Sequence, residues 1–222
     1  MGSTHEDPVD FNVMRQRMAD TQLTRRGIKD PKVINAMRAV PRHAFVPDQI
    51  KDMAYEDRAL PIGEGQTISQ PYIVALMTES LALDQEKTVL EIGAGSGYQA
   101  AVLAALAKEV YALERIEILA QRARTLLKDL GYQNVHVLAG DGSGGFPDGD
   151  RTFDAILIAA ASPEPPRHLF AQLKADGRLV VPVGGRDNQD LMLYQKTQDG
   201  IKEKKICACV FVPLLGKYGW TS

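Results

Sequence analysis

The feature that most constrains the fold of this 222-residue chain is a glycine-rich turn, Gly93-Ala94-Gly95-Ser96-Gly97. It stands between a run of strand-forming residues and an alanine-rich helical segment. Glycine at every second position lets the backbone pass close to a ligand without interference from Cβ atoms. A helix that begins just after the turn presents unpaired N–H groups and a positive dipole end. The arrangement predicts a nucleotide cradle in a doubly wound α/β fold.

The spacing of the glycines indicates which nucleotide is bound. A dinucleotide fingerprint has a small residue at the sixth position of G-x-G-x-x-G/A, where this chain has Tyr98. Glu91 stands two residues before the first glycine, and the resulting acid-x-G-x-G-x-G pattern resembles the first motif of class I S-adenosylmethionine-dependent methyltransferases. The alternative is a tight strand-to-helix turn in another Rossmann-like protein. The residues that the resemblance assigns to cofactor binding are Glu91, Gly93, Ala94, Gly95 and Gly97.

The role of Glu91 is left open between two alternatives. Its carboxylate is suited either to contact the cofactor or to support the backbone around the glycine turn.

The second half of the chain alternates strand-forming and helix-forming segments. This rhythm predicts a mostly parallel sheet covered on both faces. Two further strand-like runs flank the turn sequence Gln198-Asp199-Gly200 and predict an antiparallel hairpin. A closing hairpin is typical of methyltransferases, whereas dehydrogenase halves continue as βαβ units. Strands are expected at 88–92, 109–113, 134–139, 153–159, 178–183, 190–196 and 204–212, and helices near 97–107, 115–130 and 164–174.

The first part of the chain has a different pattern. A helix is expected over 11–26, with Gly27 as its stop, and a second helix begins at Pro31 with Asp30 as its N-cap. Residues 42–65 are expected to be irregular, with one short strand. We expect a single methyltransferase domain with three parts: a disordered tail at 1–10, a helical cap and substrate-covering segment at 11–80, and a cofactor-binding α/β core at 81–222.

Two acidic residues follow predicted strands at the edge where a doubly wound sheet binds its ligand. Glu114 is predicted to accept hydrogen bonds from both ribose hydroxyls. Asp141, with Gly142 beside it, is predicted to bind the adenine amino group. The alternatives are a helix N-cap or first-turn acid for Glu114 and an ordinary Asp-Gly turn for Asp141.

Composition limits the partners. A formal net charge of −2 provides no basic surface for nucleic acid. No apolar run approaches the roughly 18 residues of a membrane span. Cys207 and Cys209 form neither a disulfide framework nor a zinc site. We therefore expect a cytoplasmic monomer without a metal, nucleic-acid or membrane partner.

A block upstream of the glycine turn makes the resemblance specific. GQTISQPYIVALM (65–77) follows RALPIG (58–63), and both occur with LEIGAGSGY, GDG and the late FVPL. Together these motifs resemble the protein-L-isoaspartate (D-aspartate) O-methyltransferase family from about Met18 to Leu215. The TISQP block is not shared by methyltransferases in general.

The resemblance implies transfer of a methyl group from S-adenosylmethionine to the free α-carboxylate of L-isoaspartyl, and possibly D-aspartyl, residues in damaged proteins, leaving S-adenosyl-L-homocysteine. It implies that Ser69 is the active-site residue, that Thr67 contacts the cofactor and that Ile68, Ser69 and Val212 contact the substrate peptide. The carboxylate is ionised at neutral pH, so no general base is required. The alternative for Thr67 and Ser69 is to cap the helix that starts at Pro71.

Two other functions compete with this one. Another class I O-methyltransferase, acting on a small carboxylate or hydroxyl, would leave the TISQP block unexplained. A non-catalytic adaptor with the same fold would not need Ser69, Glu114 and Asp141 intact. The GKYGW tail (216–220) departs from the family pattern, so the family's tail contacts are not carried over. The sequence leaves the order of the last two strands open.

Overall fold

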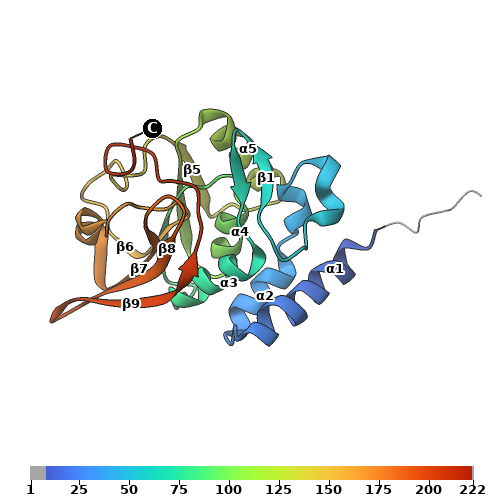
Figure 1. Cartoon of the computed structure of the whole chain (residues 1–222), viewed down its shortest axis with the longest axis horizontal. Coiled ribbons are helices and arrows are strands. Elements are labelled where there is room, and N and C mark those ends of the chain that lie inside the picture. Colours follow the sequence, from blue (N-terminus) through green and yellow to red (C-terminus); the bar gives the residue numbers. More distant parts are fainter. Residues whose placement is uncertain (1–8, 222) are drawn as a thin grey trace, which may run out of the picture.

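The computed structural model describes residues 9–221. Most of the tail expected at 1–10 therefore lies outside the described residues. The centre of the molecule is a seven-stranded sheet with strand order β5-β4-β3-β6-β7-β8-β9 (Figure 1). Its strands are β3 (Thr88–Ile92), β4 (Glu109–Glu114), β5 (Val135–Ala139), β6 (Phe153–Ile158), β7 (Leu173–Gly184), β8 (Gln189–Thr197) and β9 (Gly200–Cys209).

The direction of the strands confirms the class I methyltransferase fold. β3 to β7 pair in parallel, whereas β8 pairs antiparallel with both β7 and β9. The hairpin turn falls at 198–199, as predicted. The structure places β8 inside and β9 at the edge, which answers the question of strand order.

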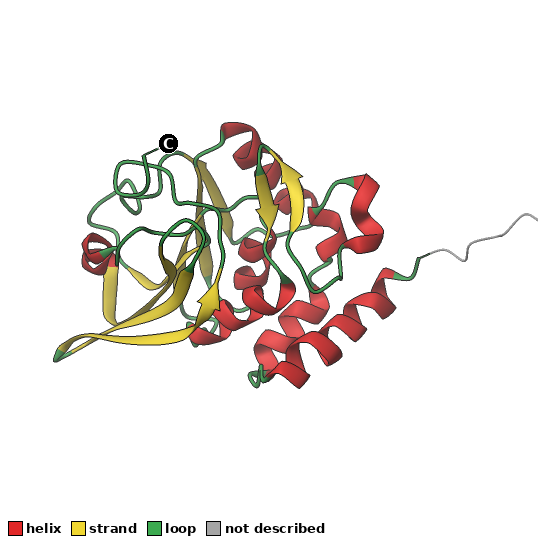
Figure 2. Ribbon diagram, in the orientation of Figure 1, coloured by secondary structure: helices red, strands yellow, loops and turns green. Residues whose placement is uncertain are grey.

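Helices cover one face of this sheet and mostly irregular chain covers the other (Figure 2). The helical face carries α3 (Pro71–Ser80), α4 (Tyr98–Ala104) and α5 (Glu117–Asp129). Their apolar residues form the larger core cluster with one set of strand side chains. The opposite face packs on the segment after β5 and on the 3₁₀ helix η5 (Arg167–Gln172).

Three expected elements were wrong in extent, and one of them is the strand expected at 178–183, which is the longer β7 (Leu173–Gly184). The helix expected at 164–174 is only η5, because β7 already begins at Leu173 and η5 packs on the sheet through Leu169. The strand expected at 204–212 ends at Cys209. Beyond it, the N–H of Phe211 donates to the Gln189 side chain at 2.8 Å instead of joining the sheet.

The N-terminal part lies against the helical face. The helix expected over 11–26 is present, although its course changes from α1 (Phe11–Met18) to a π-helical turn η1 (Ala19–Leu23) and a 3₁₀ turn η2 (Thr24–Arg26). Gly27 ends it in the left-handed region, with φ of 96°. The remaining elements are α2 (Pro31–Ala39), the 3₁₀ helices η3 (Arg42–Phe45) and η4 (Asp48–Met53), and the two-stranded sheet of β1 (Leu60–Gly63) and β2 (Gln66–Ile68).

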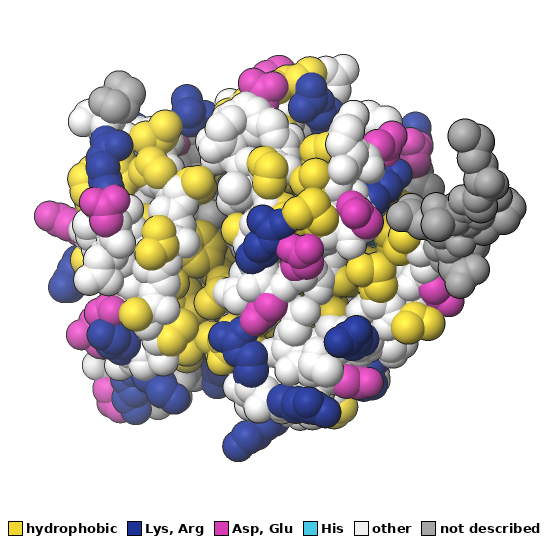
Figure 3. Space-filling model, turned by 45° about the vertical axis from the view of Figure 1, so that its right-hand side comes forward, with side chains coloured by type: hydrophobic (Ala, Val, Ile, Leu, Met, Phe, Trp, Pro, Cys, Tyr) yellow, Lys and Arg dark blue, Asp and Glu magenta, His cyan; other side chains and the backbone are white. Residues whose placement is uncertain are grey.

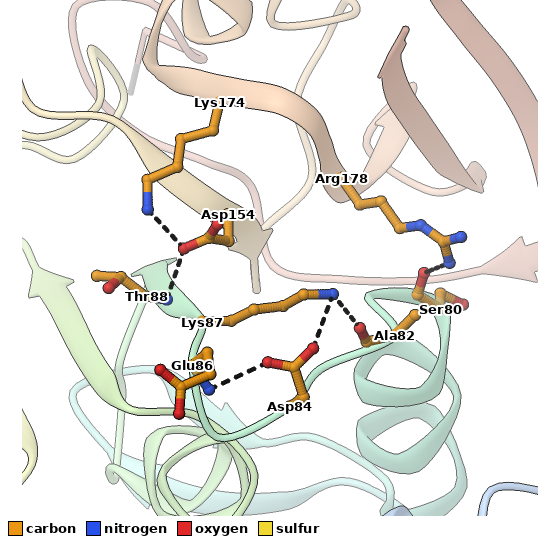
Figure 4. Close-up of polar contacts among 9 residues, drawn as sticks. All are labelled: Ser80, Ala82, Asp84, Glu86, Lys87, Thr88, Asp154, Lys174 and Arg178. Atoms are coloured by element: carbon orange, nitrogen blue, oxygen red, sulfur yellow. Dashed lines mark hydrogen bonds and ion pairs between the residues drawn. The ribbon is translucent and has the colours of Figure 1, made fainter.

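The starts of the parallel strands are tied together by Asp154 on β6 (Figure 4). Its Oδ2 accepts hydrogen bonds from the Thr88 N–H and the Lys174 ammonium, both at 2.8 Å. No helix within residues 9–221 combines the length and apolar character needed to cross a bilayer. The same range contains no group of three or more metal-ligating side chains.

Candidate functional site

The glycine turn adopts a backbone that favours glycine. Gly93, Gly95 and Gly97 have φ values of 92°, 54° and 87°. Gly97 also packs against α5, because a Cβ there would lie 3.0 Å from the Leu127 Cδ1. The turn therefore has two different tasks: Gly93 and Gly95 line a cavity, and Gly97 allows α4 to approach α5 closely.

Glu114, at the end of β4, is buried and holds the turn. Its Oε2 accepts a hydrogen bond from the Gly95 N–H and its Oε1 accepts one from the Ile116 N–H, both at 2.8 Å. It also lines the cavity beside Gly93 and Gly95. Each carboxylate oxygen has a second lone pair, so the predicted binding of ribose hydroxyls is compatible with these bonds and stays a prediction.

Glu91, on β3, is also buried but, unlike Glu114, accepts no hydrogen bond from the described residues. It is 0% exposed, and neither carboxylate oxygen has a hydrogen-bond partner within residues 9–221. Burial, and secondarily the Glu114 carboxylate, raises the pKa of Glu91 well above its usual range. It lines a small cavity together with Ser69 and Gln99.

Asp141 and Gly142 follow β5. A Cβ at Gly142 would lie 2.9 Å from the Ile92 Cγ2, so the chain passes close to β3 there. The Asp141 carboxylate accepts hydrogen bonds from the Ser143 N–H (2.8 Å) and from the Lys217 N–H (2.9 Å). Although partial burial acts to raise it, these hydrogen bonds and that of the Ser143 hydroxyl hold the pKa of Asp141 below its usual value. The adenine contact of Asp141 stays a prediction.

The contact with Lys217 was not anticipated from the sequence. The C-terminal tail folds back over the end of β5, where the Tyr218 N–H donates to the Ser143 hydroxyl at 3.0 Å. Trp220 anchors the tail, because its indole N–H donates to the Ala161 carbonyl at 3.2 Å. No motif in the sequence marks these contacts, which depend on a fold-back over 76 residues.

The TISQP block forms an extended strip that leads into α3. Gln70 is the N-cap of α3 and no side chain makes a capping hydrogen bond there. The alternative in which Thr67 and Ser69 cap the helix is therefore wrong for this structure. Both side chains instead lie along a groove of about 810 Å³.

The groove separates the strip and α3 from the end of β9 and the segment that follows it. Figure 3 shows it as a furrow with a largely hydrophobic floor. Thr67 and Ala159 line the groove and also both smaller cavities around the glycine turn. Ser69 lines the groove and the Glu91 cavity, and Val212 lines the groove and the Glu114 cavity. The groove and the glycine cradle therefore meet at these residues.

One wall of the groove contains residues that the sequence analysis missed. The Arg26 guanidinium lies 3.7 Å from the centroid of the Tyr72 ring and pairs with Asp57 at 2.7 Å. The Gln70 amide donates to the carbonyl and the carboxylate of Asp57, both at 2.9 Å. The available signals were the position of Gln70 within the TISQP block and that of Tyr72 directly after it. Ala159 was placed at the end of the fourth parallel strand but given no role.

Comparison with a family model matches residues 14–219 to "Protein-L-isoaspartate(D-aspartate) O-methyltransferase (PCMT)". A protein-L-isoaspartate O-methyltransferase 1 of Syntrophobacter fumaroxidans is 52% identical over 212 residues, which cover 96% of this chain and 99% of the relative. A protein-L-isoaspartate O-methyltransferase of Methanoregula boonei is 53% identical over 93% of this chain and 94% of its own length.

Solved structures agree with these relatives. A protein-L-isoaspartate O-methyltransferase superposes with a TM-score of 0.82 at 29% identity, covering 92% of this chain and 67% of that one. A PCMT from Plasmodium falciparum, solved with S-adenosyl-L-homocysteine, gives a TM-score of 0.79 at 25% identity over 90% of this chain and 98% of its own.

Proposed function

The chain belongs to the protein-L-isoaspartate(D-aspartate) O-methyltransferase family, and we propose that the junction of groove and glycine cradle is where it transfers the methyl group. The enzyme moves a methyl group from S-adenosylmethionine to isoaspartyl residues of damaged proteins, which starts their repair. The observation that carries the assignment of the site is the set of shared residues, Thr67, Ser69 and Ala159, at which a peptide-sized groove opens onto the cradle.

The residues of the cradle fit the cofactor. Gly93 and Gly95 leave backbone open along the cavity, and the unpartnered Glu91 carboxylate suits a cationic ligand. We assign Thr67, Glu91, Gly93, Ala94 and Gly95 to its methionine end. Glu114 is assigned to the ribose, and Asp141 with Gly142 to the adenine. Gly97 contributes through the packing of α4 and not through contact. When bound, the cofactor supplies a methyl group on a positively charged sulfur.

Ser69 has the role of orienting the substrate. In an isoaspartyl peptide the free carboxylate is an α-carboxylate with a reference pKa of roughly 3.3–3.7, so it is ionised at neutral pH and attacks without a base. The Ser69 hydroxyl donates a hydrogen bond to this carboxylate and holds it in line with the methyl group. Orientation of this kind is worth up to several kcal/mol. A normal aspartyl peptide fails because its carboxylate hangs from a different carbon.

Backbone groups after β9 suit the binding of many different sequences. Residues 210–212 have left the sheet, and Val210 is 73% exposed at the rim of the groove. A substrate peptide that pairs with Val212 and with Ile68 would gain affinity from main-chain hydrogen bonds, which do not depend on its side chains. This property fits an enzyme that meets damage in many sequence contexts.

The division of the chain follows from the position of the site. Residues 11–80 act as the cap and substrate-covering segment, and residues 81–222 act as the cofactor-binding core. The enzyme works as a cytoplasmic monomer without a nucleic-acid or membrane partner, and D-aspartyl residues are also accepted. The two unpaired cysteines support a reducing compartment. The D-aspartyl activity is supported by the name of the family, which includes D-aspartate.

The test uses three peptides of one sequence with an L-isoaspartyl, a D-aspartyl or a normal L-aspartyl residue. Each is incubated with methyl-labelled S-adenosylmethionine, and base-labile methyl ester is counted. We expect label on the isoaspartyl peptide, less on the D-aspartyl peptide and none on the normal peptide. Equal labelling of the isoaspartyl and normal peptides would contradict the orienting role of the groove. No labelling in spite of cofactor binding would contradict the site assignment altogether.

A further inference from the structure

Glu91 is a buried acid without a partner at the centre of the site. It is 0% exposed, and no donor within residues 9–221 reaches either carboxylate oxygen. The other buried acid of the site, Glu114, accepts two backbone hydrogen bonds. A carboxylate that is desolvated and unpaired is so unfavourable that such a group takes up a proton instead. Burial, and secondarily the Glu114 carboxylate, raises the pKa of Glu91, which favours the protonated form.

The surroundings of Glu91 offer no compensating positive charge. Its neighbours across the sheet, Ala112 on β4 and Leu157 on β6, are apolar. From α4 comes Tyr98, whose pKa burial raises to about 12, so it is neutral and points its hydroxyl to the Met37 sulfur at 3.7 Å.

The other polar side chains that line the cavity carry no charge. The Gln99 amide donates to the Thr78 hydroxyl at 2.9 Å, and Thr67 and Ser69 are uncharged. Arg42 does not line this cavity: its guanidinium lies 4.9 Å from the centroid of the Tyr98 ring, and its Nε donates to the Ala54 carbonyl. Within residues 9–221, the charge that acts on Glu91 is the like charge of Glu114, which adds to the effect of burial.

We propose that Glu91 is protonated in the cofactor-free enzyme and releases this proton to solvent when the positively charged end of S-adenosylmethionine enters the cavity. The inference rests on the proposed function, because it needs the cofactor in this cradle. The charges balance: a neutral carboxylic acid and a ligand cation become an ion pair, and one proton passes to the buffer. The site thus avoids an uncompensated buried anion before binding and provides a full negative charge after it.

Proton release can be counted by calorimetry. Titrations of S-adenosylmethionine into the enzyme, in buffers with different ionisation enthalpies and between about pH 5 and pH 8, give the number of protons released on binding. We expect release of about one proton at the acidic end of the range, and an affinity that rises roughly tenfold per pH unit while the empty enzyme holds the proton. S-adenosyl-L-homocysteine has the ammonium but no sulfonium, so a parallel titration separates the two cations.

Two variants test whether the released proton comes from Glu91. Glu91→Gln has the same shape but no proton to release. The number of protons released on binding should therefore be lower than in the parent enzyme by about one at the acidic end of the range. The rise of affinity with pH that comes from Glu91 should be absent. Glu109→Gln, on the exposed start of β4 where Glu109 pairs with His136, should match the parent enzyme. The comparison between variants subtracts the titration of the cofactor's own groups.

Infrared spectroscopy gives a second measurement that does not depend on the variants. The C=O band of a protonated carboxylic acid should be present in the empty parent enzyme and disappear when S-adenosylmethionine is added. A band that persists, or a proton count equal to that of Glu91→Gln at every pH, would overturn the inference while leaving the proposed function intact. Absence of cofactor binding would instead overturn the proposed function.

Discussion

The backbone N–H of Lys217 donates a hydrogen bond to the Asp141 carboxylate at 2.9 Å, so the C-terminal tail closes over the end of β5. A second bond, from the Tyr218 N–H to the Ser143 hydroxyl, lies beside it. The His168 and Tyr218 rings stack 4.5 Å apart, centroid to centroid, and extend the contact to η5. The proposed adenine-binding residue is thus held by a segment that is remote in sequence.

This contact predicts the effect of a single methyl group. In Gly216→Ala the new Cβ would overlap the Asp141 carboxylate, and the φ of 152° adds strain. The tail should therefore detach from Asp141, and the affinity for S-adenosyl-L-homocysteine should fall by roughly three- to tenfold, a loss typical of one ordinary hydrogen bond. The fluorescence of Trp220, the one tryptophan of the chain, should report the detachment. Gly185→Ala, with no atom closer than 3.9 Å, is the matched control.

Ser69→Ala should separate methyl transfer from cofactor binding. The hydroxyl that we propose to orient the substrate carboxylate is lost, so kcat/KM for an isoaspartyl peptide should fall by roughly 10- to 100-fold. The dissociation constant of S-adenosyl-L-homocysteine should stay nearly the same. Ser80→Ala, at the other end of α3, should leave both unchanged, because its hydroxyl only donates to the Leu76 carbonyl. Unchanged kcat/KM in Ser69→Ala would refute the orienting role.

Asp154→Asn should destabilise the sheet. Although partial burial acts to raise it, the hydrogen bonds from Lys174 and the Thr88 N–H hold the pKa of Asp154 below its usual value (Figure 4). Because the folded-state pKa is the lower one, this stability is present at neutral pH and is lost as the pH falls toward the folded-state pKa. We expect a loss of about 1–2 kcal/mol in urea unfolding at pH 7 and little difference in strong acid.

A comparison with an exposed pair tests that explanation. The Asp84 carboxylate lies 3.6 Å from the Lys87 ammonium and is 49% exposed (Figure 4). Asp84→Asn should cost less stability than Asp154→Asn, since exposed ion pairs contribute little. Equal losses in the two variants would show that the burial of Asp154 is unimportant.

The unpartnered Glu91 predicts the opposite pH dependence. Its folded-state pKa is raised, so the folded protein binds more protons than the unfolded chain over the interval between the two pKa values. The free energy of unfolding of the cofactor-free enzyme should therefore decline as the pH rises through the folded-state pKa of Glu91. Glu91→Gln should remove this decline, and the check is urea unfolding from about pH 5 to pH 8. A parallel decline in both proteins would assign it to other groups.

The fold was largely predictable because its signals are local. The glycine turn, the alternation from residue 88 onward and the hairpin turn each lie within a short window, and the structure confirms them. The segment after β6 was predicted less well, because the tertiary contacts of η5 and the long β7 outweigh local helical spacing there. The order of the last two strands depends on pairing between remote segments, which local patterns do not encode.

The amino-acid order alone predicts which residues carry the chemistry: the glycines, Glu114, Asp141 and the Ser69 strip stand in motifs whose spacing is read along the chain. Only the folded molecule shows that the groove and cradle meet at Thr67 and Ala159, that the tail binds Asp141 and that Glu91 has no hydrogen-bond partner among residues 9–221. The physical reason is distance along the chain. Burial, desolvation and hydrogen bonding depend on atoms brought together from segments tens of residues apart, and these contacts exist only after the core has packed.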